Sequence, residues 1–205
     1  PAFIDDMINT TEHAVRKMSN LVDHIRKPHT EEQVNLEPIH LTHLVHQFVT
    51  HYQHLAPTPH VDDAPSEVIV KADLEQLRSV LGHLIQNAQD ATPPSGEITL
   101  TIKTSKGSVV LFIQDTGSGM TEEFISDQLF KPFESTKGLT GMGIGAYQAR
   151  EYIRKIGGSI DVTSEPGIGS CFSVRIPLAS ERSGSMTEQT YRPIHDAEQP
   201  KESAN

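Results

Sequence analysis

Apolar and polar residues follow a helical period at the start of the chain. Seven mostly apolar residues recur in alternating steps of four and three: Ile4, Ile8, Thr11, Val15, Met18, Val22 and Ile25. This heptad spacing predicts a helix from Phe3 to Lys27, which Pro28 ends. A single helix cannot bury such a stripe, so the pattern favours a helical hairpin or dimer bundle. Packing on the chain's own globular part is the alternative.

Helical and strand-like patterns then take turns as far as residue 178. Two further helices are expected, one at Leu41–Tyr52 and one that begins at the capping residue Asp73. Alternating or β-branched runs predict strands at Gln33–Ile39, Glu67–Lys71, Glu97–Thr104, Ser108–Gln114, Ser159–Ser164 and Ser170–Pro177. His60 to Pro65 is expected to be turn-rich. From Ala179 onward the periodicity is lost, which predicts a disordered or loosely attached tail.

Two glycine-rich segments stand where strands and helices meet. The sequence DTGSGM at 115–120 follows an apolar, β-branched run, and GMGIG at 141–145 opens into a helical stripe. Glycines at a helix N-terminus let backbone N–H groups approach an anion, and the helix dipole adds to the attraction. We therefore expect Gly141, Gly143 and Gly145 to form a phosphate cradle. Taken alone, a G-x-G-x-G motif also fits a flexible loop at a helix start.

A line of polar side chains runs along the helix that follows Asp73. His83, Asn87 and Asp90 are spaced by four and three residues, so they share one face, while the opposite face is apolar. An ordinary wet helix face is the alternative. Asparagine in the middle of a helix has poor propensity, however, and usually needs a reason to be there. The sequence therefore indicates a second functional cluster.

Composition narrows the class of function. The chain has 205 residues and a formal net charge of -10, which argues against a general nucleic-acid binder. The single cysteine, Cys171, rules out an internal disulfide and fits a reducing compartment. No apolar run approaches the roughly 20 residues that span a bilayer, and the start at Pro1 inside a helical pattern suggests a piece of something longer. His43, His46, His51 and His54 invite a metal interpretation, but solvated histidines are favoured because no Cys or carboxylate joins them.

Three motifs now stand in order: HLIQNAQDAT on a helix, DTGSGM at a strand end, and KPFESTKGLTGMGIGAYQAR across a loop and a helix. Together they resemble the N box, first glycine box, phenylalanine box and second glycine box of the sensor histidine kinases. That family belongs to the GHKL superfamily of ATP-binding domains. The resemblance covers about Val34 to Leu178. The finer wording of the motifs resembles the PrsK-type kinases associated with PEP-CTERM/exosortase systems.

This resemblance implies an α+β fold of the Bergerat type. We expect a two-layer α/β sandwich in which a mixed, mainly antiparallel sheet of about five strands packs on three helices. It would be preceded by one long helix from a dimerisation hairpin. The implied domains are residues 1–28 (the second helix of a dimerisation and phosphotransfer hairpin), 29–178 (the ATP-binding catalytic domain) and 179–205 (a polar tail).

The resemblance also assigns roles to residues. Asn87 matches the asparagine that coordinates Mg²⁺, and Asp115 matches the residue that hydrogen-bonds the adenine amino group. Lys137 is placed to reach the terminal phosphates. The implied ATP-binding residues are Asn87, Asp90, Asp115, Gly117, Gly119, Lys137, Thr140, Gly141, Met142, Gly143, Ile144 and Gly145. Phe130 and Phe133 resemble hydrophobic anchors of a short, polar lid over roughly Thr121 to Thr140, which we expect to be mobile without nucleotide.

The sequence departs from the family pattern at two places. His83 stands where many histidine kinases carry another Asn and gyrase-like ATPases a Glu base; it would orient a water, contact phosphate or merely cap the polar face. The missing Glu argues against efficient ATP hydrolysis. In addition, no histidine within a helical pattern is followed by Asp or Glu: His13 precedes Ala14, His24 precedes Ile25, and His195-Asp196 lies in the non-periodic tail. We therefore expect this chain to bind MgATP without phosphorylating itself.

The implied function is that of the catalytic domain of a two-component histidine kinase, with His83, Asn87 and Lys137 as the candidate catalytic residues. The γ-phosphoryl of ATP would pass to an upstream histidine and then to a response regulator receiver domain. The intact protein is expected to be a homodimer through its N-terminal helix and the cytoplasmic portion of a membrane-attached kinase. One alternative is a GHKL ATPase that acts as a nucleotide-driven clamp, with His83 as its base. Another is a degenerate nucleotide-sensing or scaffold domain.

Overall fold

A single five-stranded sheet forms one layer of the computed structural model, which describes residues 35–132 and 143–179. Its strands are β2 (Pro59–Asp63), β4 (Ile98–Ser105), β5 (Ser108–Asp115), β6 (Ser159–Glu165) and β7 (Gly169–Pro177). They lie in the order β2-β4-β5-β7-β6. β2 runs parallel to β4, and every other neighbouring pair is antiparallel. The sheet is therefore mixed and mainly antiparallel, as the sequence predicted.

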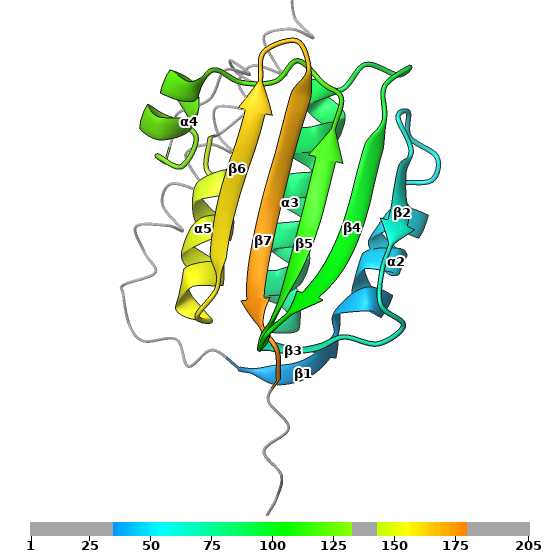
Figure 1. Cartoon of the computed structure of the whole chain (residues 1–205), viewed down its shortest axis with the longest axis vertical. Helices are drawn as coiled ribbons and strands as arrows, with labels where there is room; N and C mark the ends of the chain where they lie inside the picture. Colours follow the sequence, from blue (N-terminus) through cyan, green and yellow to red (C-terminus); the bar gives the residue numbers. More distant parts are fainter. Residues whose placement is uncertain (1–34, 133–142, 180–205) are drawn as a thin grey trace, which may run out of the picture.

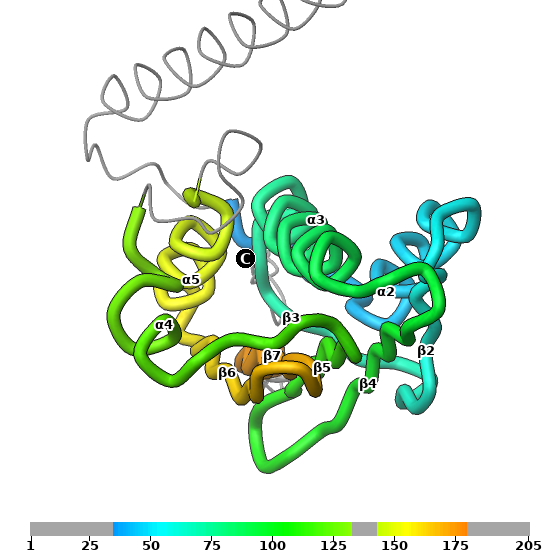
Figure 2. The backbone as a smooth tube through the Cα atoms, turned by 90° about the horizontal axis from the view of Figure 1, so that it is seen from above, coloured from blue at the N-terminus to red at the C-terminus, as the bar shows by residue number. Residues whose placement is uncertain are grey.

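Three helices form the second layer. They are α2 (Leu41–His51), α3 (Leu74–Ala91) and α5 (Gly145–Lys155). All three lie on the same side of the sheet, with α3 in the middle (Figures 1 and 2). The predicted fold, a two-layer sandwich of about five strands on three helices, is confirmed.

The core lies between these layers because the strands turn buried apolar side chains toward the helices. On β4 the buried side chains are Ile98, Leu100 and Ile102, and β5 contributes Leu111 and Ile113 from the same face. The facing stripe of α3 is fully buried and consists of Leu77, Leu81, Leu84 and Ile85. Burying one such side chain contributes about 1.5–3 kcal/mol, so α3 is held firmly over the centre of the sheet.

The start of α3 is also tied to α5. Asp73 caps α3, and its Oδ1 accepts a hydrogen bond from the Gln76 N–H at 3.0 Å, as the sequence predicted. The backbone N–H of Asp73 in turn donates to the hydroxyl of Tyr152 on α5 at 2.7 Å. Both helices therefore enter the site described below with a fixed relative position.

Two local expectations were wrong, and two expected strands have other bounds than predicted. His60 to Pro65 was expected to be turn-rich but largely forms β2, because pairing with β4 decides the conformation of this short polar run. The strands expected near Gln33–Ile39 and Glu67–Lys71 are observed with shifted bounds, as β1 (Glu37–His40) and β3 (Ile69–Ala72), and they pair with each other in a separate two-stranded sheet. Part of the expected polar loop after Thr121 forms the short helix α4 (Glu122–Asp127), which Thr121 caps.

Some predicted segments lie outside the described residues. These are the helix from Phe3 to Lys27, residues 133–142 (the second half of the expected lid and the first two residues of the second glycine-rich segment) and the tail from residue 180.

Candidate functional site

The polar residues His83, Asn87 and Asp90 lie along the second half of α3 and extend to its C-terminal end. His83 and Asn87 are half-buried, while Asp90 is exposed near the C-terminal end of the helix. The carboxylate of Asp90 accepts a hydrogen bond from Gln86 Nε2 at 2.7 Å, one helical turn earlier. The expected register of these polar groups on one helix is therefore observed.

The first glycine-rich segment packs directly on the C-terminal end of α3. The N–H of Ser118 donates to the carbonyl oxygen of Ala91 at 3.0 Å. Gly117 is buried there, and a Cβ at this position would lie 2.5 Å from the same carbonyl oxygen. No side chain fits in that space, so glycine is required for the loop to approach the helix backbone.

Asp115 lies at the end of β5 with its side chain pointing inward. It is only 4% exposed, and its Oδ1 accepts hydrogen bonds from the N–H of Gly117 at 2.9 Å and of Ser170 at 3.2 Å. Burial raises the pKa of this carboxyl above its usual value, and the two N–H donors partly oppose that shift. The carboxylate is thus a fixed acceptor in a dry environment, suited to recognising a donor on a ligand.

The turn between β6 and β7 supports this loop from its other side. The N–H of Gly167 donates to the carbonyl of Ser118 at 2.8 Å, and the N–H of Met120 donates to Ser164 Oγ at 2.8 Å. Our sequence reasoning missed Ser164 and Ser170. Ser170 comes opposite Asp115 only through the pairing of β7 with β5, which belong to two different hairpins, so no local pattern indicated it.

The second glycine-rich segment meets α3 about two turns before the first one does. A Cβ on Gly145 would lie 3.0 Å from Cγ and 3.1 Å from Cδ2 of His83, so the imidazole packs directly against the start of α5. His83 Nδ1 is buried, with no hydrogen-bond partner among the described residues. Burial lowers the pKa of His83 below the usual 6.5, which favours the neutral form of the ring at pH 7.

Asn87 lies between these two contacts on α3, one turn after His83 and one turn before Ala91. The first turn of α5 carries no acidic side chain, so its amides and dipole remain favourable for an anion. The structure therefore brings α3, the Asp115 loop and the start of α5 together. Of the other predicted residues, Gly143 and Ile144 precede α5, Gly119 sits beside the β6–β7 turn, and Lys137, Thr140, Gly141 and Met142 lie outside the described residues.

The comparison that decides the family is a match to the sequence profile of the "Histidine kinase-, DNA gyrase B-, and HSP90-like ATPase" over residues 72–180. These residues include α3, both glycine-rich segments and the last hairpin. The chain belongs to this ATPase family. The sensor protein SrrB of Staphylococcus aureus (strain NCTC 8325 / PS 47) is 36% identical over 110 residues, which is 51% of this chain and 19% of SrrB. The chain thus spans about a fifth of the length of the curated relatives it matches.

Solved structures of histidine kinases share the fold of this ATPase domain. The nucleotide-free catalytic domain of ThkA superposes with a TM-score of 0.62 and 25% identity, covering 69% of this chain and 95% of that one. Full-length ShkA in complex with AMPPNP gives a TM-score of 0.70 and 21% identity, covering 87% and 39%. ThkA in complex with the response regulator protein TrrA gives 0.69 and 22%, covering 86% and 52%. The finer PrsK-type resemblance stays a prediction.

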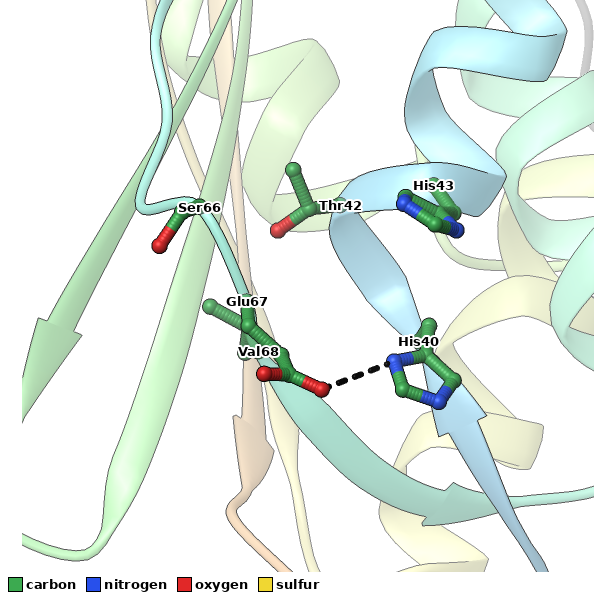
Figure 3. A pocket seen from close by; sticks show the side chains of 6 residues that line it. All are labelled: His40, Thr42, His43, Ser66, Glu67 and Val68. Carbon is green, nitrogen blue, oxygen red and sulfur yellow. Dashed lines mark ion pairs between the residues drawn. The ribbon is translucent and has the colours of Figure 1, made fainter.

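The opposite end of this ATPase domain carries a separate pocket, beside the junction of β1 and α2. Figure 3 shows its lining: His40, Thr42, His43, Ser66, Glu67 and Val68. His40 Nδ1 lies 3.4 Å from Glu67 Oε1, and both side chains are largely exposed. The histidines at 43, 46, 51 and 54 are exposed, as the sequence predicted. Among residues 35–132 and 143–179, no cluster of three potential ligands is arranged for a metal, and no helix is long and apolar enough to cross a membrane.

Proposed function

We propose that this chain is the ATP-binding catalytic domain of a two-component sensor histidine kinase. In the intact protein it transfers the γ-phosphoryl of ATP to a histidine elsewhere in that protein, and a response regulator receives it next. The main support is that three features meet along one stretch of α3. The start of α5 packs on this stretch at His83, the loop that follows the buried carboxylate of Asp115 packs on it at Ala91, and Asn87 lies between these two contacts. SrrB is a sensor protein, and ThkA was solved with a response regulator, which is consistent with this role.

In this proposal Asp115 recognises the adenine base of ATP. Its Oδ1 is already occupied by the N–H groups of Gly117 and Ser170, so the second carboxylate oxygen, Oδ2, accepts a hydrogen bond from the adenine amino group. Guanine carries a carbonyl at the corresponding ring position, so its acceptor would face a carboxylate. The buried acceptor therefore favours ATP over GTP, because an unmatched buried polar group is costly.

The phosphates are held at the other end of the same stretch of α3. The backbone amides at the start of α5 donate to them, and Lys137, predicted from the sequence alone, adds a positive charge. The amide oxygen of Asn87 fits a magnesium ion, which prefers oxygen ligands and keeps several waters beside the substrate phosphates. When bound, that ion neutralises charge on the phosphate oxygens. Such transfer depends mainly on positioning and charge neutralisation, which these residues supply.

His83 has a positioning role in this proposal. Its packing against Gly145 and its buried Nδ1 support a neutral side chain that sets the distance between α3 and α5. The alternative, a nucleotide-driven clamp with His83 as general base, requires the imidazole to reach a water. A steady-state ATP hydrolysis rate that collapses in His83→Ala would favour the clamp.

The decisive experiment is a calorimetric titration of the chain with ATP and with GTP, each with and without Mg²⁺. Asp115→Asn should weaken ATP binding about 10- to 150-fold, the equivalent of about 1.5–3 kcal/mol for a hydrogen bond to a charged group, and should reduce the preference over GTP. Asn87→Ala should bring the affinity for ATP in Mg²⁺ down to the metal-free value. Asp161→Asn on the exposed part of β6 is the matched control and should change neither.

Two results would contradict the proposal. One is a wild-type chain that binds neither nucleotide, which would point to a scaffold domain. The other is an ATP-to-GTP ratio that Asp115→Asn leaves unchanged. The transfer step is tested in the intact protein, where phosphohistidine should form with ATP and should disappear in Asn87→Ala.

A further inference from the structure

Arg150 on α5 holds Phe130 in two ways at once. Its guanidinium carbon lies 4.4 Å from the centroid of the Phe130 ring, and its Nη2 donates to the Phe130 carbonyl oxygen at 3.3 Å. One contact recognises the ring and the other recognises the backbone. Phe130 follows α4, and both views show α4 beside α5 (Figures 1 and 2). The arginine therefore fastens the segment after α4 to α5.

This arrangement has an energetic cost for the fold. Arg150 Nε is buried and has no acceptor among the described residues. The next arginine on the helix, Arg154, lies at the surface and pairs with Glu151 at 3.5 Å, whereas no carboxylate within residues 35–132 and 143–179 pairs with Arg150. A buried N–H without an acceptor destabilises a protein, and an apolar side chain of similar length would avoid that loss. An arginine here is explained if holding Phe130 in place matters for activity.

The position along the chain indicates what is being held. Phe130 stands between α4 and α5 in the sequence, and α5 begins at Gly145. The segment after α4 thus contacts, through Arg150, the same helix that the chain forms next. The start of that helix is the phosphate end of the proposed nucleotide site. A change in how Phe130 packs on α5 would therefore act at the phosphate end of the site and leave the base end, at Asp115, unaffected.

We propose that Arg150 is a positioning residue for nucleotide binding, which acts by holding Phe130 against α5 and does not itself touch the nucleotide. This inference rests on the proposed ATP site. If it holds, removing the Arg150 guanidinium and removing the Phe130 ring have the same effect on phosphate binding. The two effects are then not additive.

The test measures binding of MgATP and of adenosine to the full chain. Adenosine binding is followed through the backbone amide signals of Gly117 and Ser118. Arg150→Met and Phe130→Leu should each weaken MgATP binding about three- to tenfold and leave adenosine binding unchanged. The double variant should bind MgATP no more weakly than the single variant with the lower affinity. Phe130→Tyr keeps the ring and should bind like the wild type, as should the matched control Arg154→Met.

Each other outcome overturns the inference in a recognisable way. If Arg150→Met weakens MgATP binding but Phe130→Leu does not, the arginine contacts the phosphates directly. If adenosine and MgATP binding fall together in both variants, the pair is merely structural. Unchanged MgATP binding in both variants rejects a role in binding altogether. A wild-type chain that binds no nucleotide instead contradicts the proposed function, so the two failures are distinguishable.

Discussion

The contact between Gly145 and His83 makes a prediction in which one substitution changes sign. In an otherwise wild-type chain, Gly145→Ala would place a Cβ 3.0 Å from His83 Cγ, about 0.5 Å closer than carbon atoms normally approach. Overpacking of this kind costs about 1–3 kcal/mol. Replacing a helical glycine by alanine contributes up to about 1 kcal/mol in the opposite direction. We therefore expect the free energy of unfolding to decrease by up to about 2.5 kcal/mol.

His83→Ala removes the atoms that the new methyl group would meet. In that background Gly145→Ala should be stabilising by about 0.5–1 kcal/mol, because only the helix-propensity gain remains. The interaction energy between the two sites should be about 1–3 kcal/mol. Urea unfolding of the wild type, both single variants and the double variant, without nucleotide, measures it.

Gly82→Ala is the matched control for this cycle. Gly82 lies on α3 next to His83, and a Cβ there would meet only Phe48 Cε1, at an ordinary 3.7 Å. It should stabilise the chain in both backgrounds by the same amount. If Gly145→Ala has the same effect with and without His83, the imidazole does not limit the approach of α5 to α3, and the positioning role given to His83 is wrong.

Three further predictions concern the same region. Gly117→Ala should destabilise the chain by about 1–3 kcal/mol in urea unfolding, because its Cβ would meet the backbone carbonyl of Ala91, which cannot rotate away; a stability equal to that of Gly82→Ala would refute this. Asp115→Asn without nucleotide should leave the melting temperature at pH 7 unchanged or higher, because burial raises the pKa of Asp115 and its charge opposes folding above that pKa; a marked drop would show that the charge is needed for folding. The lowered pKa of His83 means that the unfolded chain binds its proton first, so stability should decrease as pH falls below 6.5, by at most about 1.4 kcal/mol per pH unit from this group; in His83→Ala this decrease should be smaller.

Much of the site was predictable because its functional residues stand in local sequence motifs. Asn87 and Asp115 each stand in a motif with a definite place on a helix or at a strand end, and the structure has those helices and strands where the patterns put them. The fold followed in the same way, since the core alternation of β4 and β5 and the apolar stripe of α3 are strong and long.

What escaped the sequence reasoning depends on contacts between distant residues. β2 has little alternation of its own, and its parallel pairing with β4 joins positions almost forty residues apart. α4 is short and has no buried residue, so a helical period is hard to detect in it. Ser170 and Arg150 act on partners 55 and 20 residues away, and neither residue stands out in its own neighbourhood.

The close contacts of Gly145 and Gly117 with α3 fix a distance along that helix. They fall at His83 and Ala91, so the helical rise separates them by about 12 Å along the axis. One residue inserted between them would rotate everything beyond it by about 100° and carry one contact off its partner. Length changes in this stretch should therefore be intolerable, whereas the exposed turn of β4 and β5, at Lys106 and Gly107, should accept an insertion with little loss.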